Sequence, residues 1–215
     1  ARGFSRLDEI MIVESKELLE AMGIAVVQAP GEGEMQCTQL VKDGEAWAVG
    51  SQDYDSLVVG GKRLIQNLTL ARKIKTKTGF IYIAPEIIEY EKALYSLGID
   101  PDQLICLAIL VGTDFNPGGI RGIGPKKALI LVKAKKYPVE IFREFEGRMD
   151  FDWKTIFEIF KKPNVKHEKV KFPKLDEGEI KRILVEKHDF SMERVEKQLD
   201  KLRDIKKQSG QRRLF

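Results

Sequence analysis

Residues 46–57, AWAVGSQDYDSL, decide the predicted fold and raise the first functional question. The apolar run AWAVGS has the length and composition of a buried strand. Two carboxylates, Asp53 and Asp55, follow directly after it, with only Tyr54 between them. In an extended chain, positions i and i+2 point to the same side, so the two acids would share one volume and Tyr54 would face packing. A divalent metal ion between the acids is one explanation, and a polar turn is the other.

Short apolar runs and helical segments alternate on both sides of this stretch. Further strands are expected at IAVVQA (24–29), LVVGG (57–61), RLIQNLTL (63–70) and KTGFIYIA (77–84). Helices are expected over 8–22, 34–43, 85–98 and 100–112, the last with Asp100 as N-cap and Pro101 in the first turn. This alternation predicts an α/β fold, with a mostly parallel central sheet and flanking helices.

Beyond Gly118 no further strand is expected. Helices are predicted over 125–135, 138–145, 152–160, 177–188 and 191–208. A basic connector punctuated by prolines, KKPNVKHEKVKFPK, occupies residues 161–174. The pattern divides the chain into an α/β core over 1–115, a helical portion over 116–207 and a mobile tail over 208–215.

Charge is distributed unevenly along the 215 residues. Residues 1–115 hold 11 Lys or Arg against 17 Asp or Glu, a net charge of −6, whereas residues 116–215 hold 26 against 16, a net of +10. This asymmetry predicts a cation site in the first half and an anionic partner for the second. The solvated Lys/Glu surface of a heat-stable protein would explain the abundance of charge, but not its segregation.

Other classes of protein are disfavoured by composition. No apolar run approaches the length of a membrane span, so we expect no membrane association. The two cysteines, Cys37 and Cys106, both fall in predicted helices. They are interpreted as small core residues of a reducing compartment, because two isolated cysteines form neither a disulfide framework nor a zinc site.

Further acids stand at the ends of predicted elements. Glu32 and Glu34 lie where the predicted strand over 24–29 gives way to a helix, a place where acids also favour the helix dipole. Asp114 follows an apolar helix, where a carboxylate opposes the dipole at a cost of up to about 1 kcal/mol. It could instead be a turn residue before Asn116.

Three separate segments could bring these five acids to one edge of the sheet. Such an all-oxygen ligand set favours Mg²⁺ or Mn²⁺ and suits two-metal hydrolysis of a phosphodiester. Asp-x-Asp is also used in metal-assisted sugar transfer from a nucleotide sugar. The segment that follows the acids argues against that use.

The stretch GGIRGIGPKKALILV (118–132) combines flexible glycines with a basic helix start. Gly122 and Gly124 allow close backbone approach, and the helix that begins at Pro125 presents free N–H groups to an anion. Lys126 and Lys127 oppose the dipole in the first turn, which a bound phosphate explains better than helix stability. The pattern is typical of a helix–hairpin–helix element on a nucleic-acid backbone, although the lysines could simply face water.

Three stretches, APGEGEMQC (29–37), SQDYDSLVVGG (51–61) and LAILVGTDFNPGGIRGIGPKKA (107–128), resemble the nuclease region of archaeal flap endonucleases. These enzymes belong to the wider family of structure-specific 5′ nucleases, and the similarity continues to residue 202. The resemblance implies a PIN/5′-nuclease-like fold and Mg²⁺-dependent cleavage of 5′ flaps at single-strand/duplex junctions. It also implies 5′ exonuclease activity and roles in DNA replication and repair.

The resemblance also assigns roles to residues. The implied catalytic and metal-binding acids, for two Mg²⁺ ions or Mn²⁺, are Glu32, Glu34, Asp53, Asp55 and Asp114. The implied DNA contacts are Arg121, Gly122, Gly124, Lys126 and Lys127. Backbone carbonyls of Gly119, Ile120 and Ile123 match positions that hold a monovalent ion such as K⁺.

Two departures from the family pattern affect what this chain can do. The family's N-terminal metal-binding aspartates and basic helical arch have no counterpart, so the metal site of these residues alone is expected to be incomplete. The rival hypothesis is therefore a non-catalytic DNA-junction binding module that needs a missing N-terminal piece to cut.

The tail is the second departure. Gln208, Leu214 and Phe215 match a sliding-clamp peptide, but Gln211 replaces its aliphatic residue, and a disordered basic tail is the alternative. We expect a monomer, nucleoid-associated in the cytoplasm of an archaeon or nuclear in a eukaryote.

Overall fold

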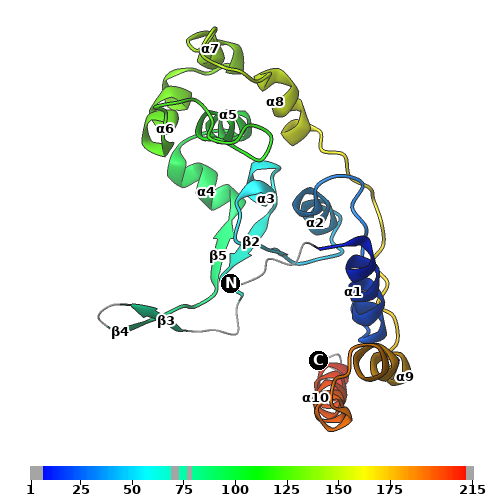
Figure 1. The fold of residues 1–215 in the computed structure, drawn as a ribbon. Coiled ribbons are helices and arrows are strands. Elements are labelled where there is room, and N and C mark those ends of the chain that lie inside the picture. The colour runs from blue at the N-terminus through cyan, green and yellow to red at the C-terminus, as the bar shows by residue number, and fades with distance from the viewer. Residues whose placement is uncertain (1–6, 69–72, 77–78, 212–215) are drawn as a thin grey trace. The chain divides into compact units, whose positions relative to one another are not determined.

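The computed structural model describes residues 7–68, 73–76 and 79–211, and the chain divides into two compact units (Figure 1). We call residues 28–169 the central unit, and residues 1–27 together with 170–215 the terminal unit. The predicted boundaries after residues 115 and 207 do not coincide with this division. Those boundaries were drawn from the distribution of charge and of functional motifs along the sequence. As boundaries between functional regions, they stay a prediction.

The sheet of the central unit is small and mixed. Strand β1 (Val49–Gly50) runs parallel to β2 (Arg63–Gln66), and β2 pairs antiparallel with β5 (Glu86–Glu89). The α/β class is confirmed, but the sheet is not mostly parallel in the described residues. The reason is that the chain returns to β2 through the hairpin of β3 (Lys73–Thr76) and β4 (Gly79–Tyr82), and not through a crossover helix (Figure 1).

Three predicted elements adopt other structures. Residues 24–29 form no strand, because no described strand pairs with them and an apolar run needs such a neighbour to complete a ladder. The strand predicted over 57–61 does not form, because residues 55–58 form the short helix α3 (Asp55–Val58), closed by a hydrogen bond from Leu57 N to Tyr54 O. The helix predicted from Pro85 begins only at Tyr90, because Ile87 and Ile88 pair with β2.

The predicted helices around the sheet otherwise form where expected. These are α2 (Gly33–Lys42), α4 (Tyr90–Leu97), α5 (Pro101–Val111), α6 (Pro125–Ala134), α7 (Pro138–Arg143) and α8 (Trp153–Lys161). Asp100 caps α5 as predicted, and Gln103 completes a capping box. Gly98 ends α4 in the left-handed conformation, at φ 64°.

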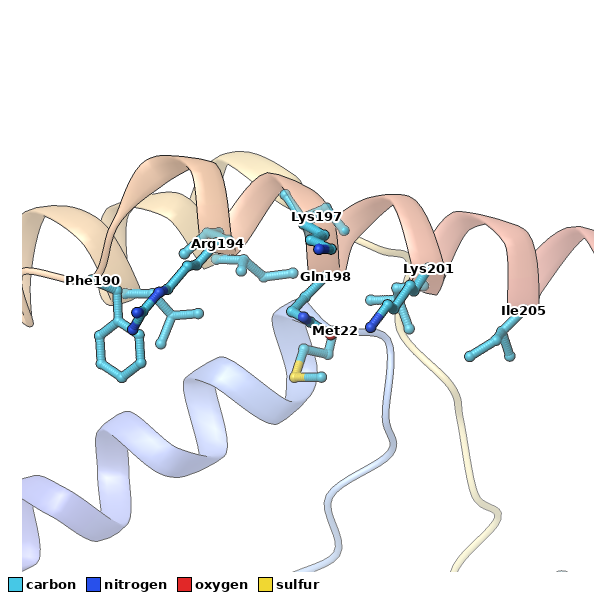
Figure 2. Close-up of a pocket in the computed structure, with 12 residues that line it drawn as sticks. Met22, Phe190, Arg194, Lys197, Gln198, Lys201 and Ile205 are labelled. Atoms are coloured by element: carbon cyan, nitrogen blue, oxygen red, sulfur yellow. The ribbon is translucent and has the colours of Figure 1, made fainter. Parts of the chain in front are cut away.

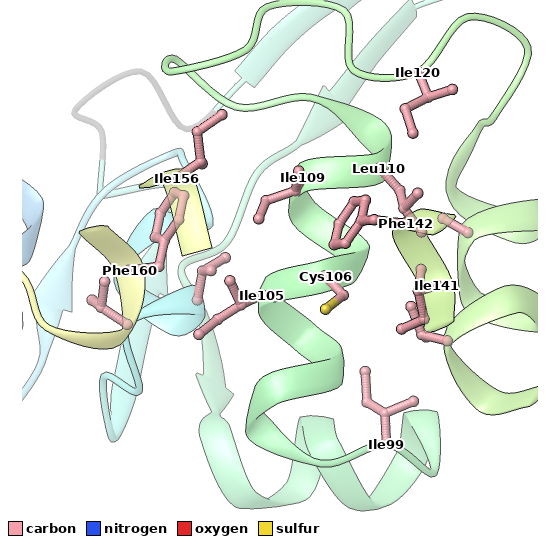
Figure 3. Packing of buried hydrophobic residues seen from close by; sticks show 14 of the residues in the cluster. Ile99, Ile105, Cys106, Ile109, Leu110, Ile120, Ile141, Phe142, Ile156 and Phe160 are labelled. Atoms are coloured by element: carbon pink, nitrogen blue, oxygen red, sulfur yellow. The ribbon is translucent and has the colours of Figure 1, made fainter. Parts of the chain in front are cut away.

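Helix α5 forms the centre of the core of this unit, surrounded by side chains from α6, α7 and α8 (Figure 3). Ile109 and Leu110 of α5 are fully buried. The ring of Phe142 stacks on Trp153 with centroids 4.5 Å apart. Cys106 is also buried, and burial raises the pKa of its thiol to about 12. The prediction for Cys37 is wrong, because this residue lies on the exposed side of α2.

In the described residues of the terminal unit, the regular secondary structure consists of helices. It contains α1 (Glu9–Ala21), α9 (Glu177–Lys181), the π-helix η1 (Arg182–Lys187) and α10 (Met192–Gln211). Its buried residues are Ala21, Ile180, Ile183, Val195 and Leu199. A hydrogen bond of 2.8 Å from Asp176 N to Ala21 O joins the start of α9 to the end of α1.

Helix α10 extends into the predicted tail. Gln208 and the three residues after it are helical, and the mobility expected for residues 208–215 stays a prediction. Leu214 and Phe215 lie outside the described residues. Among the residues that are described, no single helix could cross a membrane; α4 and α5 have the necessary length and composition only as a pair bent by 77°.

Candidate functional site: an acidic edge beside a glycine turn

The five predicted acids lie in loops and first helical turns around the carboxyl end of β1. Glu32 is the N-cap of α2 and Glu34 is in its first turn. Asp53 lies in the bend after β1, Asp55 begins α3, and Asp114 follows α5. We call these five residues the acidic edge.

The local geometry around Tyr54 differs from the prediction. Its φ of −98° and ψ of 0° are helical, so Asp53 and Asp55 are not two positions of an extended strand. The Tyr54 side chain is 58% exposed and is not packed in the core. Its hydroxyl donates to Gln66 Oε1 at 3.4 Å. Strand alternation therefore does not place Asp53 and Asp55 on one side, because α3 begins directly after the bend.

The acids nevertheless share one electrostatic environment. The pKa of Asp55 is raised to about 6, first by burial and then by the charges of the other four acids, in the order Glu34, Asp114, Asp53 and Glu32. Contributions from all three segments mean that the fold brings them together, as the sequence predicted. Their catalytic and metal-binding roles stay predictions.

Ser51 links two members of the acidic edge and was not singled out in the sequence. Its hydroxyl donates to Glu34 Oε1 and accepts a hydrogen bond of 3.1 Å from Asp53 N. The other oxygen of the Glu34 carboxylate, Oε2, is buried and finds no hydrogen-bond partner among the described residues. An orphaned carboxylate oxygen of this kind calls for a ligand, because leaving it unpaired costs about 1–3 kcal/mol or more.

The donor set fits a hard divalent cation, since it consists of carboxylate and hydroxyl oxygens. No three His, Cys, Asp or Glu residues within 7–68, 73–76 and 79–211 are arranged as a ligand group. Repulsion between like charges opposes the short separations that shared ligation requires. Asp53, Asp55 and Asp114 line one cavity of about 670 Å³, whose other walls include Leu57 and Leu104.

A buried amide organises the loop that carries Asp114. Asn116 is 4% exposed, and its Oδ1 accepts hydrogen bonds from Thr113 N at 3.2 Å and Thr113 Oγ1 at 2.7 Å. Its Nδ2 donates to Ile109 O at 2.7 Å. Sequence reasoning treated Asn116 only as part of a turn. Its role as the anchor of the loop depends on burial, which the sequence does not display.

The backbone conformation after Asp114 requires a glycine at position 119. Gly119 has φ 55°, and a Cβ there would lie 2.4 Å from Val111 C. This close approach allows Ile120 N to donate to Leu110 O at 2.9 Å. The segment that follows is thereby held against the end of α5.

We call residues 118–127 the glycine turn, which leads into α6. Gly122 has φ 85° and Gly124 is the N-cap of α6, and a Cβ at either would meet nothing within 4 Å. The backbone of this turn is therefore open to a large partner. Lys126 and Lys127 are both exposed. Lys127 Nζ also donates a hydrogen bond to Gly122 O at 3.2 Å, so this lysine supports the turn.

The remaining predicted contacts are in the same turn. Arg121 is exposed, and its carbonyl accepts a hydrogen bond from Arg148 Nη2 at 3.3 Å. Ile120 O accepts a hydrogen bond of 2.9 Å from Ile123 N, which leaves one lone pair for a cation. The monovalent-ion site at Gly119, Ile120 and Ile123 stays a prediction.

Known sequences and family models show what the chain is similar to. A family model described as the XPG I-region matches residues 23–114. Flap endonuclease 1 of Aeropyrum pernix is 48% identical over 203 residues, which cover 92% of this chain and 58% of that protein. Flap endonuclease 1 of Staphylothermus marinus is 47% identical over 202 residues, with the same shares covered. The chain thus spans about three fifths of the length of these relatives, and the predicted resemblance to archaeal flap endonucleases is confirmed.

Solved structures agree on the fold. Flap endonuclease-1 from Methanococcus jannaschii superposes with a TM-score of 0.76 at 40% identity, covering 94% of this chain and 60% of that one. The catalytic core of Rad2 in complex with DNA substrate gives 0.71 at 20% identity, covering 92% and 69%. The Holliday junction-resolving enzyme GEN1, in complex with product DNA and Mg²⁺, gives 0.62 at 18% identity, covering 92% and 56%. The last two comparisons support the 5′-nuclease-like fold alone.

Proposed function

We propose that this chain is part of a structure-specific 5′ flap endonuclease, which hydrolyses DNA phosphodiesters at single-strand/duplex junctions in replication and repair. The observation that carries the proposal is the acidic edge, where burial and the charges of four neighbouring carboxylates, from three segments, raise the pKa of Asp55. The open glycine turn follows Asp114 directly in the same unit. A set of acids adjoining a basic helix start is what phosphodiester chemistry on a nucleic acid requires.

Glu32, Glu34, Asp53, Asp55 and Asp114 would hold Mg²⁺ or Mn²⁺, with two ions in the proposed scheme. When bound, such ions supply activation of water and positive charge at the scissile phosphate. Ser51 fixes the Glu34 carboxylate through one oxygen, which leaves Oε2 for the ligand. The same hydroxyl accepts from Asp53 N, so the hydrogen-bonded serine aligns acids of two different segments.

The glycine turn and the start of α6 would hold the DNA backbone. Gly122 and Gly124 are exposed, with open space where a Cβ would lie, and the N-terminus of the ten-residue α6 favours a phosphate. Lys126 and Lys127 add positive charge at that point, and Arg121 is exposed on the same turn. None of these groups reads a base, so we propose recognition of DNA shape and not of sequence.

Several further properties belong to the same proposal. They are 5′ exonuclease activity, K⁺ at the carbonyls of the glycine turn, clamp binding through Gln208, Leu214 and Phe215, a monomeric state and a nucleoid location. Each rests on the resemblance to flap endonucleases, of which this chain spans about three fifths.

The second candidate is a DNA-junction binding module that does not cut alone. The observation that favours it is the lack of a metal-ligand group among the three described ranges. In this case the acids are present, but further ligands from another piece of protein would be needed to gather them around a metal ion.

A cleavage assay with a 5′-flap DNA and Mg²⁺ separates the two candidates. The wild-type chain is compared with Asp114→Asn, which removes one acid of the edge. Asp150→Asn is the matched control, since Asp150 is an exposed aspartate outside the acidic edge. Affinity for the same flap is measured in parallel by fluorescence anisotropy in the presence of a chelator.

The nuclease proposal predicts that the wild type and Asp150→Asn cut the flap, while Asp114→Asn binds it within a few-fold but leaves it intact. Binding without cleavage by the wild type would support the binding module. Equal cleavage by all three proteins would remove Asp114 from the site. A failure to bind the flap at all would contradict both candidates.

A further inference from the structure

A groove of about 830 Å³ runs along α10 in the terminal unit, and no residue of the acidic edge lines it. Met22 at the end of α1 and Leu184 of η1 contribute to its wall, and Phe190 and Ile205 lie toward its two ends along α10 (Figure 2). All of the lining residues belong to the terminal unit, and none of them has a part in the function proposed above.

The groove exposes large apolar side chains. Phe190 is 53% exposed and Ile205 is 62% exposed, although neighbours such as Val195 and Leu199 are buried. Covering side chains of this size favours association, because it removes apolar surface from water. Both exposed side chains line the same groove, and exposed apolar side chains that share one hollow are typical of an interaction surface.

The charges of α10 are segregated between its faces. Glu196 forms an ion pair of 2.5 Å with Lys181, and Asp200 pairs with Arg203 at 2.5 Å, so these acids are neutralised inside the terminal unit. Arg194, Lys197 and Lys201 line the groove, and none of the ion pairs found in the described residues involves them. The groove therefore has an apolar floor and a positive border.

We propose that this groove docks an acidic amphipathic helix of a partner protein. Apolar side chains on one face of that helix would cover Phe190 and Ile205, and its flanking Asp or Glu side chains would pair with Arg194, Lys197 and Lys201. A groove that binds a helix in this way contacts apolar side chains of that helix at positions i, i+3 or i+4 and i+7. Charge complementarity at the border would set specificity and the rate of association.

Two other occupants fit less well. The DNA backbone would satisfy the cations, but it offers no apolar surface to cover Phe190 and Ile205. A second copy of the same groove would bring like charges together, which opposes association. An acidic amphipathic helix would cover the apolar floor of the groove and also pair with the positive charges of its border.

The test uses the whole chain and a fluorescent synthetic peptide, an amphipathic helix with Leu on one face and Glu on its flanks. Two peptide controls replace every Leu by Ser or every Glu by Lys. The protein variants are Phe190→Ala with Ile205→Ala, and Lys197→Glu with Lys201→Glu. The matched controls are Tyr95→Ala, since Tyr95 is 90% exposed on α4, and Lys62→Glu, a reversal of an exposed lysine in the central unit.

The proposal predicts that the wild type and both control proteins bind the acidic Leu peptide equally, by fluorescence anisotropy. Each double variant should lose about ten-fold or more in affinity, because each removes at least one anchor or attraction worth about 1.4 kcal/mol. Thermal unfolding by circular dichroism verifies that the variants, all changed at exposed positions, remain folded.

Several results would overturn the proposal. Equal binding of the Ser or Lys peptides would show that no amphipathic acidic helix is selected, and equal loss in the control proteins would show that the groove is not the site. Duplex DNA that competes with the peptide and depends on the same variants would make the groove a nucleic-acid surface. Concentration-dependent dimerisation lost in the double variants would identify a second copy as the occupant.

Discussion

The acidic edge draws its side chains from three separate segments, whereas the glycine turn is contained within residues 118–127. In the acidic edge, like charges are held near one another, and one buried oxygen of Glu34 has no partner in the described chain. In the glycine turn, backbone groups pair within the turn, with Asn116 just before it, with the end of α5 and with the Arg148 side chain. The first arrangement holds repelling charges near one another, whereas the second is fixed by hydrogen bonds of its backbone, including the one to the end of α5.

Substitution of three glycines tests how strictly the glycine turn is determined by its backbone. Gly119→Ala should lower the free energy of unfolding by about 3 kcal/mol, because both the positive φ and the contact with Val111 oppose a Cβ. Gly122→Ala should cost about 1–2 kcal/mol from φ alone. Gly124→Ala is the control, since its φ is −94° and the space is open.

Urea denaturation of the three variants measures these differences. The expected order of destabilisation is Gly119→Ala, then Gly122→Ala, then Gly124→Ala. Equal stability of Gly119→Ala and Gly124→Ala would mean that the turn is not locked against α5.

The lysines of the glycine turn provide a test of binding. Lys126→Ala with Lys127→Ala should weaken affinity for flap DNA about ten-fold near physiological salt, because two phosphate contacts are lost. The slope of log affinity against log salt should fall by about 0.9 for each contact. Lys62→Glu, in the same unit but outside the turn, is the control. An unchanged slope in the double variant would exclude the two lysines from the interface.

The acidic edge should respond to substitution in the opposite direction from the glycine turn. Asp55→Asn should raise the free energy of unfolding by about 1 kcal/mol in the presence of a chelator, because it removes a partly buried charge that its neighbours repel. Asp53 is more exposed, so Asp53→Asn should gain less. Thermal unfolding of both variants at neutral pH measures the effect. A loss of stability in Asp55→Asn would mean that repulsion does not dominate at this edge.

The sequence predicted local elements better than the arrangement of strands. Gly98 and Asp100 correctly marked a helix end and a helix start, because caps depend on neighbouring residues. Residues 24–29 were predicted as a strand on composition, but a strand also needs a partner, which the described residues do not provide. Ile87 and Ile88 were placed in a helix, and only the register with β2 shows that they form a strand.

In the candidate site, too, some features were predicted from the sequence and others were not. Glu34, Asp55 and Asp114 were predicted to come together, and the charges of Glu34 and Asp114 do raise the pKa of Asp55. The sheet edge was the wrong reason for Glu34, because residues 24–29 form no strand. The predicted geometry at Asp53 was also wrong, because a bend and α3 replace an extended strand. Ser51 and Asn116 were missed, because a serine or asparagine in a loop has no pattern that shows its burial or its partners.

Titration of the chain with Mn²⁺, followed by electron paramagnetic resonance, tests whether the acidic edge is a divalent-metal site. The wild type should bind Mn²⁺ in competition with Mg²⁺. Glu34→Gln and Asp55→Asn should bind more weakly by about ten-fold or more, since each removes one anionic ligand. Asp150→Asn should bind as the wild type does. If all four proteins bind Mn²⁺ equally, or none binds it, the acidic edge of this chain is not a divalent-metal site.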